Sequence, residues 1–502
     1  MNRKIVDIVW FKRDLSVYDN ILLLQASRSK GVLLLYIFEP DLWLQPDLSF
    51  RQYQFLTDAL SDFKKELIEV GGQLIIKVGS AVEVLNELSA RYDIRRLWSH
   101  QETWNLWTYK RDKQVSLWTK SRGIEWIQPP RNGVIRNLKN RDGWSSQWQT
   151  LMNKKVICRP DHIDSFYMIS DVIPSARSLK LDETQLPSTQ KASRAHAIDS
   201  LQSFLDMRGS NYMFEMSSPI TAEQACSRIS PYLAFGQISV REVYQATEKR
   251  RKELITSDNN YSKSLKSFAS RLRWHCHFIQ KLENQPSIET NTLHSAFENL
   301  RANNCDHKTF TAWATGTTGY PMIDACMRYL NATGWLNFRM RAMLVSFASY
   351  HLWLDWRVTA KHLARQFLDY EPGIHYNQIQ MQSGTTGMNS IRIYNPVKQG
   401  VDQDPNGKFI RKWVPELKDI PNQFIHQPWL LEDVNLNYPK PIVDEKLART
   451  AAQEKIYSLK EQIKNSAETK SLVQKHASRL NRKPRRKLKP STPVKKQLSL
   501  GL

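Results

Sequence analysis

The chain has 502 residues and carries 72 Lys and Arg against 49 Asp and Glu, a formal net charge of +23. Hydrophobic residues make up 41% of it and aromatic residues 10%, so it has the apolar surface for a large core and is not disordered throughout. The basic excess favours a polyanionic partner, either nucleic acid or an anionic membrane surface. At about 100–200 residues each, this length predicts two to four domains.

The five cysteines stand at positions 158, 226, 276, 305 and 326, and no two of them form a CxxC pair. Their odd number and wide spacing argue against a disulfide scaffold and against a structural metal site, so we expect reduced thiols and a cytoplasmic protein. No stretch approaches the roughly 20 apolar residues of a membrane span, and the first apolar run is too short for a signal peptide.

The first third alternates short β-rich runs with amphipathic stretches. Strands are predicted at Ile5–Trp10, Val32–Phe38 and Leu74–Val78, with weaker candidates at Arg96–Trp98 and Trp126–Gln128. Helices are predicted between them, at Arg51–Val70, Ala81–Tyr92 and Leu106–Arg122. This alternation predicts an α/β domain with a parallel sheet over residues 1–130.

Residues 131–195 lose both periodicities and contain Pro160, Pro174 and Pro187, which indicates a long linker. Residues 196–440 are expected to form a second, all-α domain. Its strongest helical segments are Ala195–Met207, Val240–Thr256, Leu265–Glu283, Pro321–Ala332, Arg339–Trp356 and Ala360–Leu368.

Residues 441–502 change composition again. A polar helix is predicted from Asp444 to about Lys470. From Ser471 to Leu502 the chain has ten Lys or Arg and no acidic residue, so this tail is predicted to be disordered. It suits a nonspecific DNA-binding arm or a localisation signal, and a solvated end without a role is the alternative.

The common nucleotide-binding and hydrolase motifs are absent. The sequence has no GxxxxGK[ST], GxGxxG, HExxH or GxSxG. This argues against an ordinary ATPase, dehydrogenase, zinc protease or α/β-hydrolase.

A turn of small and basic residues comes just before a predicted helix start. It consists of Cys226, Ser227, Arg228, Ile229 and Ser230. Backbone N–H groups, serine hydroxyls and an arginine fork in such a turn can hold a phosphate. The alternative is a capped helix with a surface arginine.

One helical segment concentrates Arg271, Arg273, Trp274, His275 and His277. A tryptophan among cations suits stacking on a base or ring, and the alternative is a core tryptophan with solvated neighbours. The two histidines are two positions apart and lie on different helix faces, so they are not a metal pair.

Two further segments suggest a buried ion pair. Trp335 and Arg341 lie where a long apolar helix begins, while Asp369 and Glu371 open a stretch predicted to be irregular, DYEPGIHYNQIQMQSGTTG. A carboxylate close to Arg341 would form a charge-assisted pair. A structural salt bridge is the alternative, although long irregular segments in helical domains are often functional.

With these motifs in place, the sequence resembles the photolyase/cryptochrome flavoprotein family, in a divergent bacterial-type branch. The resemblance runs from VWFKRDLSVYDN at residues 9–20 to RKWVPEL at residues 411–417. Its most specific blocks are CSRISPYLAFGQIS (226–239), TGYPMIDACMRYLNATGW (318–335) and IRIYNPVKQ (391–399). Membership implies an N-terminal α/β domain, a long linker and a helical domain that binds FAD noncovalently.

The resemblance also assigns flavin contacts by motif position. Tyr212 would lie on the phosphate side, the turn Cys226–Ser230 would line the pyrophosphate, and Trp335 would flank the flavin. The remaining positions on the flavin side are Arg341, Asp369, Glu371 and His375. His375 is a departure, because photolyases commonly have Asn there and plant cryptochromes Asp, and its charge would tune the flavin redox state.

Departures cluster where the substrate would bind. Trp274 matches a lesion-stacking tryptophan, but Arg271 replaces a glutamate that hydrogen-bonds cyclobutane dimers in common photolyases. Phe338 and Ala342 replace an asparagine and a methionine, and they stand where (6-4) photolyases carry catalytic histidines. Met381 replaces a second stacking aromatic residue.

The family's electron-relay tryptophans are also altered. Trp356 matches the middle member, whereas Ile379 and Asn303 occupy the inner and outer places. Photoreduction by the usual route is therefore expected to fail, and the candidates for another path are Trp353, Tyr350 and Tyr376.

The resemblance implies a cyclobutane-dimer photolyase, a carbon–carbon lyase in which photoexcited reduced FAD gives an electron to a pyrimidine dimer in damaged DNA. The alternative is a cryptochrome-like blue-light receptor without repair activity. An antenna chromophore in the α/β domain is left open, whether folate, deazaflavin, a second flavin or none. We expect a monomer without a membrane partner.

Overall fold

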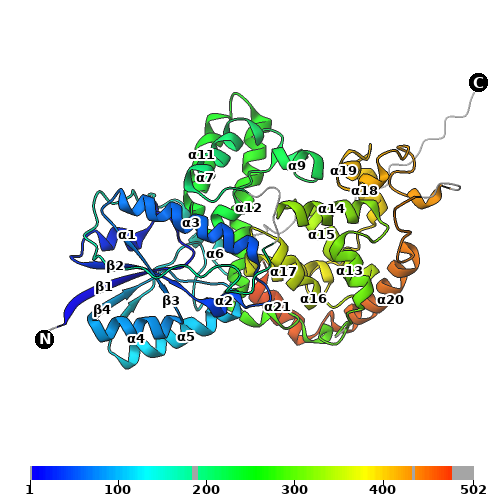
Figure 1. Ribbon diagram of the computed structural model, residues 1–502. Helices are drawn as coiled ribbons and strands as arrows, with labels where there is room; N and C mark the ends of the chain where they lie inside the picture. The colour runs from blue at the N-terminus through cyan, green and yellow to red at the C-terminus, as the bar shows by residue number, and fades with distance from the viewer. Residues whose placement is uncertain (1–2, 184–189, 303, 432–435, 478–502) are drawn as a thin grey trace, which may run out of the picture.

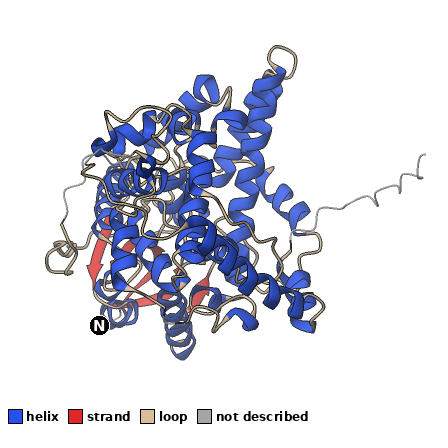
Figure 2. Cartoon of the chain, turned by 90° about the vertical axis from the view of Figure 1, so that its right-hand side faces the viewer, coloured by secondary structure: helices blue, strands red, loops and turns tan. Residues whose placement is uncertain are grey.

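The computed structural model describes residues 3–183, 190–302, 304–431 and 436–477. An α/β half and a helical half pack side by side (Figure 1). Figure 2 shows the same division, with the strands gathered in one part and helices making up the rest. Within the described residues, no helix is long and apolar enough to cross a membrane.

The sheet of the α/β half has five parallel strands in the order β3-β2-β1-β4-β5. Their bounds are β1 (Lys4–Phe11), β2 (Val32–Phe38), β3 (Leu74–Val78), β4 (Tyr92–Trp98) and β5 (Glu125–Ile127). Every residue of β2 is buried, as expected where helices cover both faces of a parallel sheet. The predicted parallel α/β fold is confirmed, and both weaker strand candidates are strands.

Helices cover each face of this sheet (Figure 1). On one face lie α1 (Ile21–Ala26) and α3 (Phe50–Ile68), whose apolar residues join a core that continues into the helical half. On the other face α4 (Ala81–Arg91) and α5 (Leu106–Ser121) bury a second, separate core. A short helix, α2 (Pro40–Trp43), follows β2.

The described residues after the connector are mostly helical, as predicted. The connector itself carries a helix that was not predicted, α6 (Trp144–Met152). The helices that follow are α7 (Arg194–Ser203), α8 (Tyr212–Glu215), α9 (Pro219–Ala225), α10 (Ser230–Phe235), α11 (Val240–Glu253), α12 (Asn259–Asn284), α13 (His307–Thr315), α14 (Pro321–Thr333), α15 (Phe338–Ser346), α16 (Trp356–Gln366), α17 (Pro372–Ser383), α18 (Pro396–Gln403) and α19 (Lys408–Trp413).

Two predictions for this half were wrong. The stretch after Asp369 is not irregular, because Pro372 opens α17, a position where proline costs no hydrogen bond. The helix predicted over Arg339–Trp356 is broken instead. It passes into a π-helical turn, Phe347–His351, and a new helix starts at Trp356 behind the N-cap Asp355.

The C-terminal prediction was partly wrong as well. The single polar helix is two helices, α20 (Glu445–Ile463) and α21 (Ala467–His476), with Ser466 as the N-cap of the second. Disorder was predicted from Ser471 onward, but α21 continues to His476 because Leu472 and His476 are buried. The remaining tail, residues 478–502, lies outside the described residues.

Arg51 of α3 joins the two halves. Its buried guanidinium donates hydrogen bonds to the carbonyls of Leu330 and Asn331 near the end of α14, and to that of Gln366 at the end of α16. Helix C-termini leave carbonyls without intrahelical partners, so one side chain satisfies two helix ends at once.

We expect Arg51→Met to lower the free energy of unfolding by about 2–4 kcal/mol, because three buried carbonyls lose charge-assisted hydrogen bonds. Denaturant unfolding followed by circular dichroism measures this. The control is Arg91→Met, which removes an arginine whose side chain is 61% exposed and should change stability little. Equal effects of the two substitutions would contradict the role given to Arg51.

Candidate functional site

The turn predicted to hold phosphate lies between α9 and α10. Cys226 ends α9 in an extended conformation, and Ser230 begins α10. Between them Arg228 has a φ of 61°, in the left-handed region, and Ile229 follows in the right-handed helical region. Among the described residues, no group accepts a hydrogen bond from the backbone N–H groups of residues 227–230. Successive free N–H groups in such a turn form a concave site for an anion.

Arg208 braces this turn from behind. It ends a π-helical turn, Phe204–Arg208, and donates to the carbonyls of Gln224 at 2.7 Å and Cys226 at 2.6 Å. Holding the carbonyls on one side leaves the N–H groups free on the other. Arg208 was not among the residues predicted for the site, and it stands one residue past the end of the helix predicted at Ala195–Met207.

Arg228 combines a strained backbone with a guanidinium that is only partly satisfied, since Nη2 donates to Gln190 Oε1 at 3.4 Å. Its guanidinium carbon lies 4.0 Å from the centre of the Trp335 ring, and its Nε has no hydrogen-bond partner among the described residues. A non-glycine residue kept in the left-handed region costs free energy and is typical of functional sites. The 4.0 Å contact also shows that two of the predicted site residues, Arg228 and Trp335, lie together.

The predicted ion pair of Arg341 and Asp369 is present and is bidentate, with N–O distances of 3.0 and 2.9 Å. Ser230 donates a hydrogen bond from its hydroxyl to the same carboxylate at 2.6 Å. The turn Cys226–Ser230, called the anion turn below, is therefore tied to this ion pair. Burial opposes ionisation of Asp369, yet the charge and hydrogen bonds of Arg341 hold its pKa below the ordinary value. Asp369 is therefore a fixed negative charge inside the helical half.

Glu371 points away from this pair, toward the α/β half. It accepts a hydrogen bond from Arg13 at 2.9 Å, and Arg13 also donates to the carbonyl of Ala234 in α10. Burial raises the pKa of Glu371 despite Arg13. Arg13 thus connects the segments on both sides of the candidate site.

His375 is buried in α17, with Nε2 2.9 Å from the carbonyl of Ala360. Because a carbonyl only accepts, Nε2 carries the proton and donates it. Burial lowers the pKa of His375 to about 4, so the ring is neutral at neutral pH and Nδ1 is free to accept a hydrogen bond. His375 therefore does not carry at neutral pH the positive charge that was considered from the sequence.

Tyr212 is buried in α8 with its ring edge-on to Phe204 and Phe268. Burial raises the pKa of its hydroxyl, and Arg271 of α12 acts against that shift. The structure therefore places Arg271 beside Tyr212.

Three of the positions assigned to a lesion pocket are at least partly exposed, whereas Ala342 is not. Trp274 of α12 is half-buried, with its ring 5.0 Å from His277 and 5.6 Å from Phe278. Phe338 is 53% exposed at the start of α15, and Met381 of α17 is half-buried. No hydrogen bond or ring contact joins these described side chains to one another, and Ala342 is buried.

Of the three relay positions, Trp356 and Ile379 are both buried. The guanidinium carbon of Arg357 lies 4.9 Å from the Trp356 ring, and a cation there disfavours a positively charged radical on the indole. Asn303 lies outside the described residues. The relay prediction stays untested.

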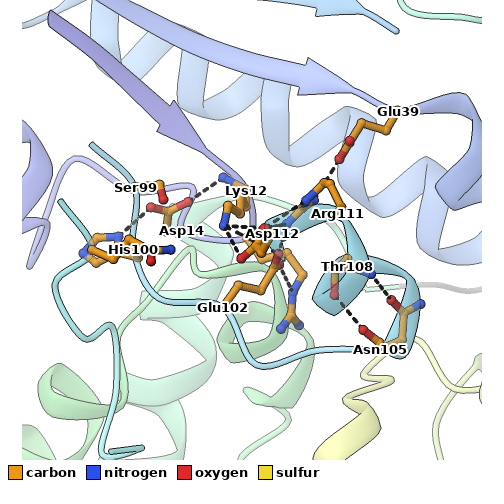
Figure 3. A network of polar contacts seen from close by, with 12 residues as sticks. Lys12, Asp14, Glu39, Ser99, His100, Glu102, Asn105, Thr108, Arg111 and Asp112 are labelled. Atoms are coloured by element: carbon orange, nitrogen blue, oxygen red, sulfur yellow. Dashed lines mark hydrogen bonds and ion pairs between the residues drawn. The ribbon is translucent and has the colours of Figure 1, made fainter. Parts of the chain in front are cut away.

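A second polar cluster fills the carboxyl end of the sheet, where ligands bind in open α/β folds (Figure 3). Arg111 of α5 donates to Glu39 at 2.8 Å and to Asp112 at 2.8 Å, and Lys12 pairs with Asp112 at 3.0 Å. Glu102 accepts from Arg111 and from Arg13. These buried charges alternate in sign and compensate one another.

Two small cavities lie beside this cluster, with volumes of about 50 and 40 Å³. Sites for drug-sized ligands have roughly 300–1,000 Å³. A planar second chromophore would bind at this end of the sheet only after charged side chains such as Glu39 and Arg111 had moved.

Comparison with known proteins agrees with both halves of the structure. The family described as "DNA photolyase" matches residues 7–141, and "FAD binding domain of DNA photolyase" matches residues 268–458. The deoxyribodipyrimidine photo-lyase of Vibrio cholerae is 28% identical over 470 residues, which are 88% of this chain and 97% of that protein. The cryptochrome DASH of Synechocystis is 26% identical, over 87% of this chain and 95% of that one.

Solved structures show the same fold. A bacterial class III photolyase from Agrobacterium tumefaciens superposes with a TM-score of 0.78 at 26% identity, covering 92% of this chain and 99% of that one. An archaeal photolyase from Sulfolobus tokodaii, described with two FAD molecules, gives 0.75 at 24% identity, covering 90% of this chain and 100% of that one. The chain belongs to the photolyase/cryptochrome family, and its helical half is that family's FAD-binding domain.

The residues present fit the cofactor. The free N–H groups of residues 227–230 and the unpartnered Nε of Arg228 suit a pyrophosphate, and buried Asp369 fixes the Arg341 guanidinium beside the same turn. When bound and reduced, FAD supplies light-driven one-electron transfer. Substitution of single residues would test which of them hold the cofactor.

We expect Arg228→Ala to weaken FAD binding about 10- to 150-fold, because a charge-assisted contact of about 1.5–3 kcal/mol is lost. The flavin-to-protein absorbance ratio after purification and a fluorescence titration of apoprotein measure this. The matched control is Arg159→Ala, an exposed arginine paired with Glu69. Full flavin content in Arg228→Ala would rule out the phosphate role.

Proposed function

We propose that the protein is a cyclobutane pyrimidine-dimer photolyase. In this reaction an electron from the bound, reduced cofactor would reach the dimer under light, the two carbon–carbon bonds that join the pyrimidines would break, and the electron would return, so there would be no net redox change. The observation that carries the proposal is the assembly of the anion turn, the Arg341–Asp369 pair and half-buried Trp274 in one helical domain.

The chain's own side chains have separable tasks in this proposal. The anion turn and Arg228 hold the cofactor phosphates, and Arg341 donates hydrogen bonds from a position fixed by Asp369. Neutral His375 offers Nδ1 as an acceptor while Nε2 is held by Ala360. These groups are positioned before the light reaction, so they need no rearrangement during it.

Substrate binding would use exposed groups at the mouth of the site. A flipped dimer stacks on an aromatic face, and Trp274 presents one without being fully buried. Arg271 and the net charge of +23 supply phosphate contacts around the lesion. Because such contacts release counterions, DNA affinity should fall steeply with salt concentration.

A cryptochrome-like photoreceptor is the second candidate. Two observations favour it: Met381 offers no second stacking ring, and Arg271, in place of a dimer-binding glutamate, lies beside Tyr212. The cryptochrome DASH relative is consistent with either function.

A repair assay separates the two candidates. The flavin is reduced chemically, so that the altered relay cannot mask activity. The substrate is an oligonucleotide with one cyclobutane thymine dimer, single-stranded or duplex, kept in light or in darkness. Thymines restored only in light support the photolyase, whereas no repair by fully reduced, FAD-loaded protein favours the receptor.

We expect Trp274→Ala to weaken binding of dimer-containing DNA by about 5- to 150-fold, the range given by loss of roughly 1–3 kcal/mol of stacking. Affinity for undamaged DNA should hardly change. Fluorescence anisotropy on both DNAs measures the ratio, with Tyr109→Ala, an exposed aromatic residue of α5, as the control. A parallel loss on both DNAs would exclude a lesion-stacking role.

A further inference from the structure

Four buried basic side chains meet near the C-terminal end of α12. They are His277 and Lys281 of α12, Arg141 of the connector before α6, and His476 at the end of α21. Their exposed fractions are 5%, 4%, 4% and 0%, in that order. Three segments far apart in sequence therefore bring basic groups into one interior site, which shares no residue with the anion turn.

The hydrogen-bond donors of this basic cluster are largely unsatisfied. Arg141 gives one bond, from Nη2 to the carbonyl of His277 at 3.1 Å, while its buried Nε and Nη1 have no partner among the described residues. The Lys281 side chain has no hydrogen bond or ion pair in the described part of the chain, and its Nζ lies 5.5 Å from the Phe278 ring. His476 uses Nε2 toward Gln285 at 2.9 Å and leaves Nδ1 unpartnered.

Among the described residues, the groups whose charges shift the pKa values of Lys281, His277 and His476 are all bases. Burial, and then Arg141, lowers the pKa of Lys281 to about 8. Burial, and then Lys281, lowers the pKa of His476 to about 3 and that of His277 to about 2. The neighbouring Lys475 adds a further cation, whereas the carboxylate of Glu283 is engaged with Thr103 and lies near Arg136.

Without a bound anion, this arrangement lowers the stability of the folded state. A buried cation without a counter-charge loses hydration that nothing replaces, and unsatisfied buried donors add to the cost. The charge network at the carboxyl end of the sheet is built differently, because acids alternate with bases there. An anion bound among these basic side chains would give the basic cluster the same alternation of charge.

We propose that Arg141, Lys281 and His476 form a binding site for a small phosphate-type oxyanion that fastens α21 to α12. Arg141 and Lys281 bring two positive charges, which match the charge of about −1.5 to −2 on a phosphate group. Arg141 Nε and Nη1 and Lys281 Nζ are the donors, and the charge of the bound anion would favour protonation of His476, whose Nδ1 would then donate as well. Because the side chains are more than nine-tenths buried, the site would take a free anion or the end of a mononucleotide rather than a continuous DNA backbone.

The test uses full-length, FAD-loaded protein. Thermal unfolding midpoints are measured in chloride and in phosphate at equal ionic strength, for wild type and Lys281→Met. Phosphate stabilises proteins in general, so the informative quantity is the difference between the two shifts. The control is Lys398→Met, an exposed lysine whose side chain is 70% accessible. We expect wild type and control to gain the larger shift in phosphate, and Lys281→Met to be at least as stable as wild type in chloride.

Two further measurements do not depend on that variant folding well. Calorimetric titration of wild type with inorganic phosphate should show one saturable site per chain, and a separate titration with adenosine 5′-monophosphate distinguishes a free anion from a nucleotide end. Hydrogen exchange of the α21 amides should slow by several-fold when phosphate binds. Absence of saturable binding, equal phosphate shifts in wild type and Lys281→Met, or unchanged exchange in α21 would each overturn the proposal.

Discussion

The buried carboxylate of Asp369 is the contact on which the helical half depends. It receives both arms of the Arg341 guanidinium and the hydroxyl of Ser230, so three segments distant in sequence share one charge. Because that charge is paired and hydrogen-bonded, Asp369 stays ionised in spite of its burial. Removal of any partner would leave a charge or a donor unsatisfied in the interior. The anion turn and the start of α17 are therefore fixed relative to each other before any cofactor binds.

The chain contains two clusters of buried charged side chains that differ in composition, one with acids and bases together and one with bases. At the carboxyl end of the sheet, Arg111 lies among Glu39, Glu102 and Asp112, and every charge has an opposite neighbour. Near the end of α12, the described groups whose charges act on Lys281, His277 and His476 are bases. The first arrangement is self-sufficient and fills a crevice that would otherwise be open to a ligand. The second is incomplete, which is the reason for assigning an anion to it.

The sequence predicted much of this structure because its signals were local. Buried β-rich runs gave the strands, and the spacing of apolar residues gave the long helices of both halves. The Arg341–Asp369 pair was predicted from residue types and from the family's motif. The errors arose where a local signal was overridden or overlooked. Pro372 marks the start of α17, yet the polar residues that follow hid the helix, while burial of His476 extended order beyond the point where composition predicted disorder. Arg208 and Arg51 could not be predicted, because each acts on carbonyls that only the tertiary fold brings within reach.

Arg51 also limits how this chain could be recombined with its relatives. The arginine belongs to the α/β half, whereas the carbonyls that it satisfies belong to α14 and α16 of the helical half. Gln52 repeats the pattern, since its side-chain amide donates to Ala364 and Phe367. The halves are therefore not interchangeable modules. A chimera that joined this sheet to the helices of a relative would keep its stability only if both α3 side chains met equivalent helix ends, so the two halves are constrained to evolve as a pair.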